Sequence, residues 1–352
     1  MNIQISVAPR AITLLFAVAA SLATTAAVAQ QKYKAPRTEY GQPDLQGVWT
    51  NATITPLQRS AQYGDRRVHT TAEAKQLEEG IAEANAAADK PTDINASTEK
   101  VLNSGCELRG FGGSASCAYN NFWTDPGTKL VDINGEKRTS IIVEPADGRI
   151  PAALPAAQAR LAARREKLRG SGPFDGPEQR PLGERCIMSF GSSAGPPMLP
   201  LLYNNNYQIV QTKDSVSILV EMVHDTRVIR IDGSHVPNGV RKWMGDSIGR
   251  YEGDTLVVET TNFNENHTYQ NASENRKVTE WFTRIGPDKI LYRFTVDDPT
   301  SYAKPFSGEL ALNAGNGHIY EYACHEGNYA LMGILAGARE EENAKAKDEK
   351  KK

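Results

Sequence analysis

Beyond residue 30 the chain has no long apolar run. A membrane-spanning helix needs about 20 consecutive, mostly apolar residues, so the sequence predicts no span in this part. The chain also lacks an excess of charge of either sign, because 40 lysines and arginines stand against 42 aspartates and glutamates, for a net charge of -2. Without a basic excess, neither nucleic acid nor an anionic membrane surface is an expected partner.

The chain also lacks the short motifs that indicate a metal or a cofactor. It has no H-E-x-x-H and no paired C-x-x-C, the spacings that are typical of zinc sites. We therefore expect no metal and no cofactor. The alternative is a metal site assembled from His224, His325 and a carboxylate such as Asp225 or Glu326. The other histidines are isolated in the sequence: His69, His235, His267 and His318.

The N-terminus has the pattern of a secretory signal peptide. Met1–Arg10 is short and carries one positive charge, Ala11–Ala20 is apolar, and Ala27-Val28-Ala29 is a small-residue cleavage site. We expect residues 1–29 to be removed, the mature chain to begin at Gln30, and the protein to be periplasmic or secreted. The alternative is a retained anchor, but the apolar run is shorter than the about 20 residues that a span needs.

Four cysteines in an exported chain predict two disulfides. Cys106 and Cys117 lie close together in a glycine- and serine-rich stretch, where a bond would close a local loop. Cys186 and Cys324 would then join the start of the strand-rich half to its end, and closing so long a loop stabilises by about 4 kcal/mol in the chain-entropy model. Other connectivities remain open, and a second interpretation leaves Cys324 as a reactive thiol beside His325.

Composition divides the chain into four regions. Residues 1–29 are the signal peptide, and residues 30–180 are expected to form an arm, a first short strand, two helices and the disulfide loop. Residues 181–338 are expected to form the β-barrel core. Residues 339–352 form a charged run without an apolar face, which predicts a disordered tail.

The two helices are expected on the periphery of the core. The first covers Thr70–Ala88, where Thr70 and Glu73 have the spacing of a capping box. The second covers Pro155–Leu168, with Pro155 in its first turn and Gly170 as its stop.

From Cys186 onward the apolar residues alternate with a period of two, which indicates strands with one buried face. The two clearest strands carry these apolar positions: Val216, Ile218, Val220 and Met222 in one, and Ile290, Tyr292, Phe294 and Val296 in the other. Turn signals separate the strands, and such short connections join antiparallel neighbours. We therefore predict a mainly β fold, an antiparallel meander of about eight strands that closes into a barrel with a ligand cavity at one mouth.

Gly47-Val48-Trp49 lies on the expected first strand. It resembles the G-x-W signature of lipocalins and other calycins. The resemblance implies a calycin-like barrel whose closed end is plugged by Trp49. The alternative is an ordinary core tryptophan in a sheet.

A serine nucleophile is a further alternative. Gly245-Asp246-Ser247-Ile248-Gly249 fits G-x-S-x-G, the nucleophile elbow of α/β-hydrolases, and Ser247, Asp297 and His325 follow that fold's triad order. An elbow needs a strand before it and a helix after it, whereas this segment runs into a hairpin. Gly191–Gly195 fits the same pattern, so a serine hydrolase using Ser247 is kept only as an alternative.

The densest group of titratable side chains lies in Tyr320–Tyr329, and a second pair, His224-Asp225, follows the strand that begins at Val216. The parity of His224 directs it inward at the end of that strand. We predict an acid–base site with His224 as the base, Asp225 beside it, and His325 or Glu326 as the acid. The two imidazoles are then expected within about 8 Å of each other. The alternative for His224 is a structural core histidine.

Five further residues are predicted to hold the substrate at this site. Arg250 or Arg284 would bind an anionic group, because a guanidinium forks onto carboxylates. Tyr203, Asn205 and Glu221 would bind polar substituents, with Glu221 on the strand face opposite His224.

Several long segments resemble a widespread group of exported bacterial proteins. The resemblance covers most of residues 43–338 and implies export and a β-rich fold, without implying a reaction. The stretch that contains Cys106 and Cys117 is less typical of that group. The segments are Pro43–Trp49, Tyr207–Thr212, Glu221–Asp225, Gly245–Thr260 and Tyr320–Tyr329.

These observations lead to three functional hypotheses. The first is an exported enzyme whose acid–base site lies in or at the mouth of a β-barrel and which eliminates, isomerises or hydrolyses a small organic molecule. The second is a noncatalytic periplasmic carrier of an apolar or aromatic ligand. The third is a structural surface protein without a ligand. The substrate and the oligomeric state are not predicted.

Overall fold

The structure is a computed structural model of the chain. The described residues belong to one compact unit. The structure describes residues 33–88, 95, 124–168, 172–315 and 317–350. The predicted signal peptide and the predicted disulfide between Cys106 and Cys117 lie outside the described residues.

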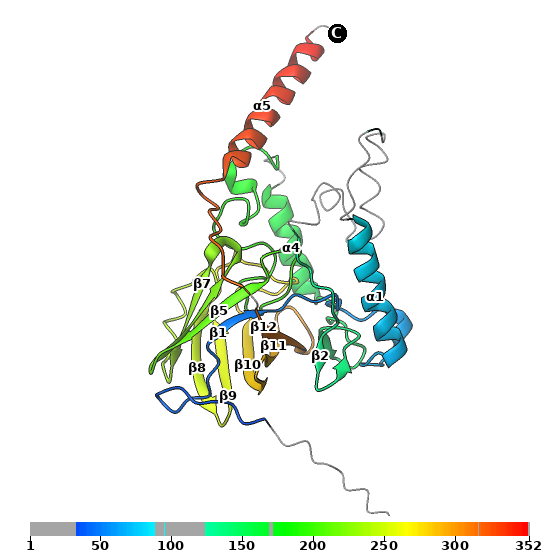
Figure 1. Ribbon diagram of the computed structural model, residues 1–352. Helices are drawn as coiled ribbons and strands as arrows, with labels where there is room; N and C mark the ends of the chain where they lie inside the picture. The colour runs from blue at the N-terminus through cyan, green and yellow to red at the C-terminus, as the bar shows by residue number, and fades with distance from the viewer. Residues whose placement is uncertain (1–32, 89–94, 96–123, 169–171, 316, 351–352) are drawn as a thin grey trace, which may run out of the picture. The chain divides into compact units, whose positions relative to one another are not determined.

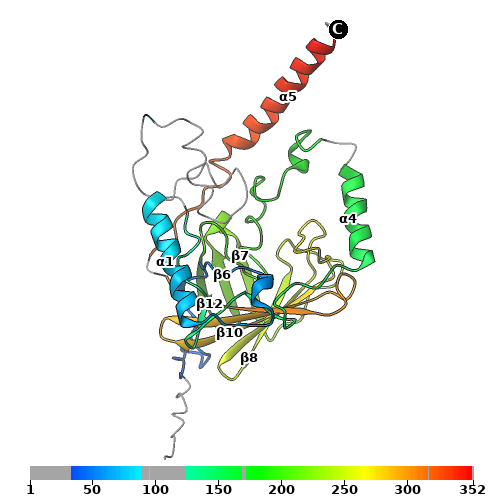
Figure 2. The ribbon, with the colours of Figure 1, turned by 90° about the vertical axis from the view of Figure 1, so that its right-hand side faces the viewer.

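Nine strands form a closed barrel, so the fold is mainly β (Figure 1, Figure 2). Neighbours around the barrel follow the order β1-β5-β6-β7-β8-β9-β10-β11-β12, and β12 pairs with β1 to close the ring. The strands are β1 Gly47–Thr50, β5 Asn206–Gln211, β6 Ser215–Val220, β7 Thr226–Ile231, β8 Asp246–Glu252, β9 Thr255–Thr261, β10 Lys277–Gly286, β11 Lys289–Asp297 and β12 Phe306–Ala314. A short strand, β4 (Ile142–Glu144), pairs with β12 in addition.

The expected antiparallel meander is wrong at one place, because β7 and β8 pair in parallel. A parallel pair needs a crossover that carries the chain back to the end where it started, and residues 232–245 make this connection. Asp246 fixes the crossover: its carboxylate accepts hydrogen bonds from Lys242 Nζ at 2.6 Å and from the backbone of Val236 at 3.1 Å, and it pairs with Arg230. Burial alone would raise the pKa of Asp246, but these bonds hold it well below its usual value.

The antiparallel hairpins and their inward faces are as predicted. Short turns join β5 to β6, β8 to β9 and β10 to β11. We call the end of the barrel with these turns the hairpin end, and the opposite end, at Thr50, Asn206, Val220 and Thr226, the loop end. Inward apolar side chains no more than 2% exposed fill the barrel: Ile209, Val216, Ile218, Val220, Ile229, Leu256, Val258, Val278, Phe282, Ile290, Phe294, Val296, Phe306, Leu310 and Leu312.

A buried ion pair lies among these apolar side chains. Arg227 on β7 and Glu280 on β10 are 3% and 0% exposed, and both guanidinium NH groups donate to the carboxylate, at 2.5 and 3.0 Å. The hydroxyl of Tyr292 on β11 donates to the same carboxylate at 2.8 Å. Both carboxylate oxygens and two of the three guanidinium nitrogens are therefore hydrogen-bonded, as a buried charge requires, while Arg227 Nε has no partner among the described residues.

Residues 186–201, which we call the plug loop, close the loop end of the barrel. Ala194, Met198 and Leu199 belong to the hydrophobic core. The Met198 amide donates to the Tyr292 hydroxyl at 2.9 Å, and the Tyr207 hydroxyl donates to the Ser193 carbonyl at 2.9 Å. The plug loop is thus attached to the side chains inside the barrel.

The helices lie outside the barrel wall (Figure 1, Figure 2). α1 spans Thr71–Ala88 and begins with the capping box, in which the Glu73 amide donates to Thr70 Oγ1 at 3.2 Å and the Thr70 amide donates to Glu73 Oε2 at 2.8 Å. α4 spans Pro155–Leu168. The remaining short elements are the 3₁₀ turns η1 Ala61–Tyr63, η3 Pro177–Gln179 and η4 Met222–His224, and the strands β2 Asp132–Ile133 and β3 Glu136–Lys137.

A third helix, α5 (Tyr329–Glu349), replaces most of the tail that was expected to be disordered from residue 339. The side chain of Asn328 caps it by accepting from the Leu331 amide, which satisfies one of the free amides of the first turn. Arg339 donates to the carbonyls of Phe174 and Asp175. Alanine, glutamate and lysine, which dominate its second half, are strong helix formers. Among the described residues, no helix is both long and apolar enough to cross a membrane.

Candidate functional site

The turn between β6 and β7 is strained, and it carries His224. Val223 has φ 60° and His224 has φ 47°, a left-handed backbone that is rare for a β-branched residue. Strain of this kind costs of the order of 1–3 kcal/mol per residue and gathers at functional sites. The predicted inward orientation of His224 is wrong. β6 ends at Val220, so the alternation of a strand does not extend to His224, and its side chain is exposed.

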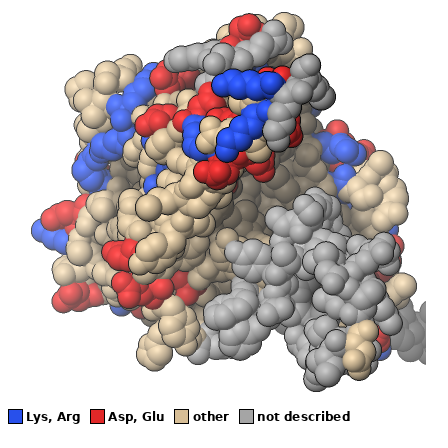
Figure 3. All heavy atoms as spheres, turned by 90° about the horizontal axis from the view of Figure 1, so that it is seen from above, with Lys and Arg blue, Asp and Glu red and all other residues tan. Residues whose placement is uncertain are grey.

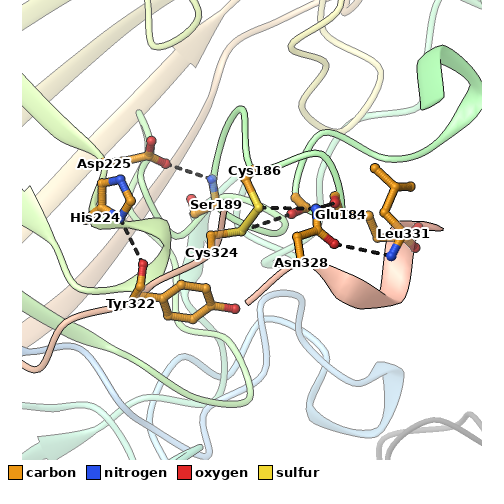
Figure 4. Close-up of a disulfide and its surroundings, with 10 residues drawn as sticks. Glu184, Cys186, Ser189, His224, Asp225, Tyr322, Cys324, Asn328 and Leu331 are labelled. Atoms are coloured by element: carbon orange, nitrogen blue, oxygen red, sulfur yellow. Dashed lines mark hydrogen bonds between the residues drawn. A yellow bond between two sulfur atoms is a disulfide. The ribbon is translucent and has the colours of Figure 1, made fainter. Parts of the chain in front are cut away.

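A single hydrogen bond orients the His224 imidazole. Its Nδ1 lies 2.9 Å from the carbonyl oxygen of Tyr322 (Figure 4). Because a carbonyl can only accept, Nδ1 has to carry the hydrogen, and Nε2 then keeps its lone pair in the neutral ring. The arrangement leaves an exposed imidazole that can accept a proton.

Asp225 lies directly after His224 and is half-buried. Its carboxylate accepts from the Ser189 amide of the plug loop at 2.7 Å (Figure 4). Burial raises the pKa of Asp225, against the opposing effects of the Ser189 hydrogen bonds and of His224. A carboxyl group of this kind keeps its proton to a higher pH than an exposed one, so the pair contains a candidate base and a candidate acid.

Residues 320–328, which we call the strap, cross the loop end beside His224. The predicted disulfide between Cys186 and Cys324 is confirmed, with an S–S distance of 2.05 Å (Figure 4). The side-chain amide of Asn328 donates to the Glu184 carbonyl at 2.8 Å. Because Cys324 is bonded, the interpretation of a reactive thiol is wrong. The bond fits an extracellular or periplasmic protein.

The strap also carries His325 and Glu326, whose side chains are exposed. Since Tyr322 contacts His224, the segment that contains both residues lies at the predicted site. The proximity of the two imidazoles stays a prediction, as does the role of Glu326.

Three predicted substrate-binding residues lie at the loop end. Tyr203 is half-buried. Asn205 is 1% exposed, and its side chain holds the backbone of Leu201 and Asp125. Glu221 is 3% exposed and accepts from Asn206 Nδ2 at 2.6 Å and from the Tyr320 amide at 3.3 Å. Asn205 and Glu221 are therefore committed to holding the plug loop and the strap.

The two arginines lie away from His224. Arg250 is exposed on β8 and pairs with Glu252 at 2.7 Å. Arg284 belongs to the hairpin end, where it donates to the carbonyls of Asp44 and Pro287. An anion held by Arg284 would lie at the opposite end of the barrel from His224, so the predicted grouping of these residues is wrong for Arg284.

Ser247 lacks the setting of a nucleophile. It lies inside β8, is 2% exposed, and shares a hydrogen bond of 2.8 Å with the Thr260 hydroxyl. A strand, β9, follows it instead of the helix that an elbow needs. Within the part of the chain that the structure describes, no three His, Cys, Asp or Glu side chains come together to hold a metal.

At the loop end lies a pocket of about 920 Å³ beside the plug loop, which we call the mouth pocket. Its walls come from six parts of the chain: the segment that follows β1, the end of α1, residues 124–128, Ile141, the plug loop and residues 268–270. Apolar atoms form most of the lining surface. The lining consists of Thr53, Ile54, Thr55, Pro56, Leu57, Ile81, Ala84, Asn85, Thr124, Asp125, Pro126, Gly127, Thr128, Ile141, Gly191, Ser192, Leu199, Pro200, Leu201, Thr268, Tyr269 and Gln270.

Close backbone contact brings two of these walls together. Thr53 donates from its hydroxyl to the Lys129 carbonyl at 2.8 Å, and the Ile54 amide donates to the same carbonyl at 3.0 Å. Gly127 has φ +88°, and a Cβ there would lie 2.6 Å from the Thr53 nitrogen. Only glycine fits here without displacing the Thr53 backbone, so Gly127 allows the two segments to pack this closely.

Behind the wall formed by Tyr269 lies a buried cation. Arg276 is 0% exposed, stacks 3.7 Å above the Phe263 ring, and donates to the carbonyls of His267 and Ser273. Burial lowers the pKa of Arg276 to about 10, and Asp298 opposes this shift. Arg276 thus stays charged at neutral pH and has an acidic neighbour.

Figure 3 shows the molecule from the side of the loop end, where a hollow is bordered by uncharged atoms on one side and by charged side chains on another. Comparison with models of protein families, with curated proteins and with solved structures finds no match to this chain. The interpretation of the loop end therefore depends on its geometry.

Proposed function

We propose that this chain is an exported protein that binds a small organic molecule in the mouth pocket and acts as a noncatalytic carrier. The observation that carries the proposal is the pocket itself, about 920 Å³ with a mostly apolar lining. Small-molecule sites are concave, mostly apolar and roughly 300–1,000 Å³ in size. The barrel interior is occupied by buried apolar side chains, which supports a ligand site outside it.

Two observations support export and a calycin-like relationship as parts of this proposal. The Cys186–Cys324 bond is of the kind that persists in the periplasm or outside the cell, which agrees with the predicted signal peptide. Trp49 lies on β1, is 2% exposed, and donates from Nε1 to the Leu45 carbonyl at 2.9 Å. A buried tryptophan on the first strand of a barrel is what the G-x-W resemblance implies.

Filling the mouth pocket should abolish binding. Ala84 lies on the face of α1 that lines the pocket, so Ala84→Trp places an indole in the ligand's space and is expected to weaken binding at least about tenfold. The measurement is a fluorescence titration of the mature protein with the uncharged apolar dye Nile red.

Ala82→Trp is the matched control, because Ala82 is exposed on the same helix and does not line the pocket. It is expected to bind the dye like the parent protein. Equal affinities of the two variants, or no saturable binding by the parent, would contradict the proposal.

A second function, an acid–base enzyme, is favoured by one specific observation. The hydrogen bond from His224 Nδ1 to Tyr322 fixes the tautomer that leaves Nε2 as a base, beside Asp225. None of His224, Asp225, His325 and Glu326 is among the described residues that line the mouth pocket. This enzyme would therefore use the exposed turn and strap, and its chemistry would be elimination, isomerisation or hydrolysis.

The enzyme hypothesis predicts that His224→Gln loses turnover by a factor of about 10² to 10⁴, the usual contribution of a general base. Binding and thermal stability should not change, because the side chain is exposed. His318→Gln is the control, since His318 is exposed on the segment leading to the strap. Screening lyase, isomerase and esterase substrates with both variants is the measurement, and turnover that survives in His224→Gln would rule out this base.

A further inference from the structure

We propose that the mouth pocket selects organic cations and that Asp125 recognises their positive charge. Such ligands have an apolar body and an amine. The inference rests on the proposed binding function and specifies its ligand class. Four observations carry it: the charges in the lining, the fixed position of Asp125, the balance of the charges nearby, and the aromatic wall.

The lining contains one ionisable group that is charged at neutral pH. Among the described residues that form the pocket, Asp125 is the only acidic one, and none is Lys, Arg or His. The other polar side chains are neutral hydroxyls and amides, from residues such as Thr55, Ser192 and Gln270. A ligand with a carboxylate would find no cation in this lining, whereas an amine would find a carboxylate.

Asp125 is held by its backbone while its side chain stays available. Its amide donates to the Leu202 carbonyl at 2.9 Å, and its carbonyl accepts from Asn205 Nδ2 at 2.8 Å. Asn205 is 1% exposed and also accepts from the Leu201 amide at 2.7 Å, so one buried amide joins Asp125 to the plug loop. The Asp125 carboxylate makes no hydrogen bond or ion pair to any residue that the structure describes.

The neighbouring charges balance one another. Lys129 and Lys137 both pair with Glu78, at 3.1 and 3.0 Å, and Lys137 also pairs with Asp132 at 3.4 Å. On the other side, Arg276 behind the wall has Asp298 as its acidic neighbour. Each of these charges has an opposite charge close to it, which weakens its field at a distance, whereas Asp125 is the acidic residue of the pocket lining itself.

Tyr269 adds an aromatic surface to the same pocket. The face of an aromatic ring attracts a cation within about 6 Å of its centre. A carboxylate at the rim and a tyrosine in the wall, with Leu199 and Ile141 to cover an apolar body, are the groups by which proteins recognise organic amines. The same groups repel a carboxylate of equal size.

Three probes of matched size test the ligand class: naphthylethylamine, naphthylethanol and naphthylacetate, titrated calorimetrically into the mature protein. The amine is expected to bind about tenfold more tightly than the acid, with the alcohol between them, because an ion pair near the surface changes affinity by a few-fold in each direction. In Asp125→Asn the amine should lose its advantage and match the alcohol. Asp288→Asn, at an exposed position in a turn of the hairpin end, should leave the order unchanged.

The outcomes separate the two proposals. Equal binding of all three probes, or tightest binding of the acid, would overturn the inference about Asp125 and leave the carrier function standing. An amine preference that survives in Asp125→Asn would also overturn it. If none of the probes binds and Nile red does not bind either, the proposed function itself fails.

Discussion

Replacing Glu280 by alanine is expected to reduce the free energy of unfolding by about 3–5 kcal/mol, because it leaves a buried guanidinium without its partner. Arg227 is 3% exposed and both of its donating NH groups bind Glu280. The Tyr292 hydroxyl loses its acceptor in the same variant. Most single domains are stable by only about 5–15 kcal/mol, so urea denaturation should show a large shift of the midpoint.

The paired replacement Arg227→Met with Glu280→Leu is the control that identifies the cause. Removing both charges together and refilling their volume is often neutral or stabilising, because the desolvation penalty of the ions disappears with them. The double variant should therefore recover most of the stability that Glu280→Ala loses. A double variant as unstable as the single one would mean that packing around these positions, and not the unpaired charge, determines the loss.

Removing the disulfide should have the second large effect. The bond between Cys186 and Cys324 closes a loop with a sequence separation of 138 residues, and loops of this length correspond to about 4–5 kcal/mol in the chain-entropy model. Cys186→Ala with Cys324→Ala is expected to lower the free energy of unfolding by this order. Urea denaturation of the variant and of the parent, both without reductant, is the measurement.

A second measurement distinguishes a local effect of the disulfide on the strap from a global effect on stability. The strap contacts His224 through the Tyr322 carbonyl, so its release should allow the His224 ring to exchange between tautomers. Nitrogen-15 NMR of the imidazoles reports this exchange. His267 is the internal reference, because it is 5% exposed and bonded to the Trp243 carbonyl, far from the strap in the sequence. If His224 keeps one tautomer in the variant, the strap does not need the disulfide to stay in place.

The period-two pattern predicted the strands well because the barrel has one apolar face. Val216, Ile218 and Val220 all point into the core at 0–1% exposure, as alternation requires. The same alternation also contained a signal of the buried ion pair, which was not predicted. Arg227 and Glu280 have inward parity on their strands, and a charged residue on an apolar face indicates a buried partner on another strand.

Other features could not be predicted because they depend on contacts between distant segments. The parallel pairing of β7 with β8 follows from where the crossover returns, and the polar residues 232–245 contain no signal of that direction. β1 is only four residues long, so its role in closing the barrel is decided by its partners. The mouth pocket combines six segments, and no local pattern connects them.

His224 illustrates the same limit at a single residue. Parity predicted an inward side chain, but two consecutive left-handed residues, Val223 and His224, reverse the chain before that position. Such a conformation opposes the local preference of valine, and only the surrounding structure can impose it. The sequence predicted the Cys186–Cys324 disulfide correctly, whereas the orientation of His224 and the mouth pocket follow from contacts between distant segments.

The closing seam of the barrel has a consequence for how the protein is made. Trp49 and Thr50 on β1 pair with Ala314 and Asn313 on β12, so the first and last strands of the ring are neighbours. Until β12 has left the ribosome, the earlier strands have no closed sheet to join, and their unpaired edges can pair with other chains. Contacts between distant residues also slow folding. The ring can therefore close only after residues 306–314 have been synthesised.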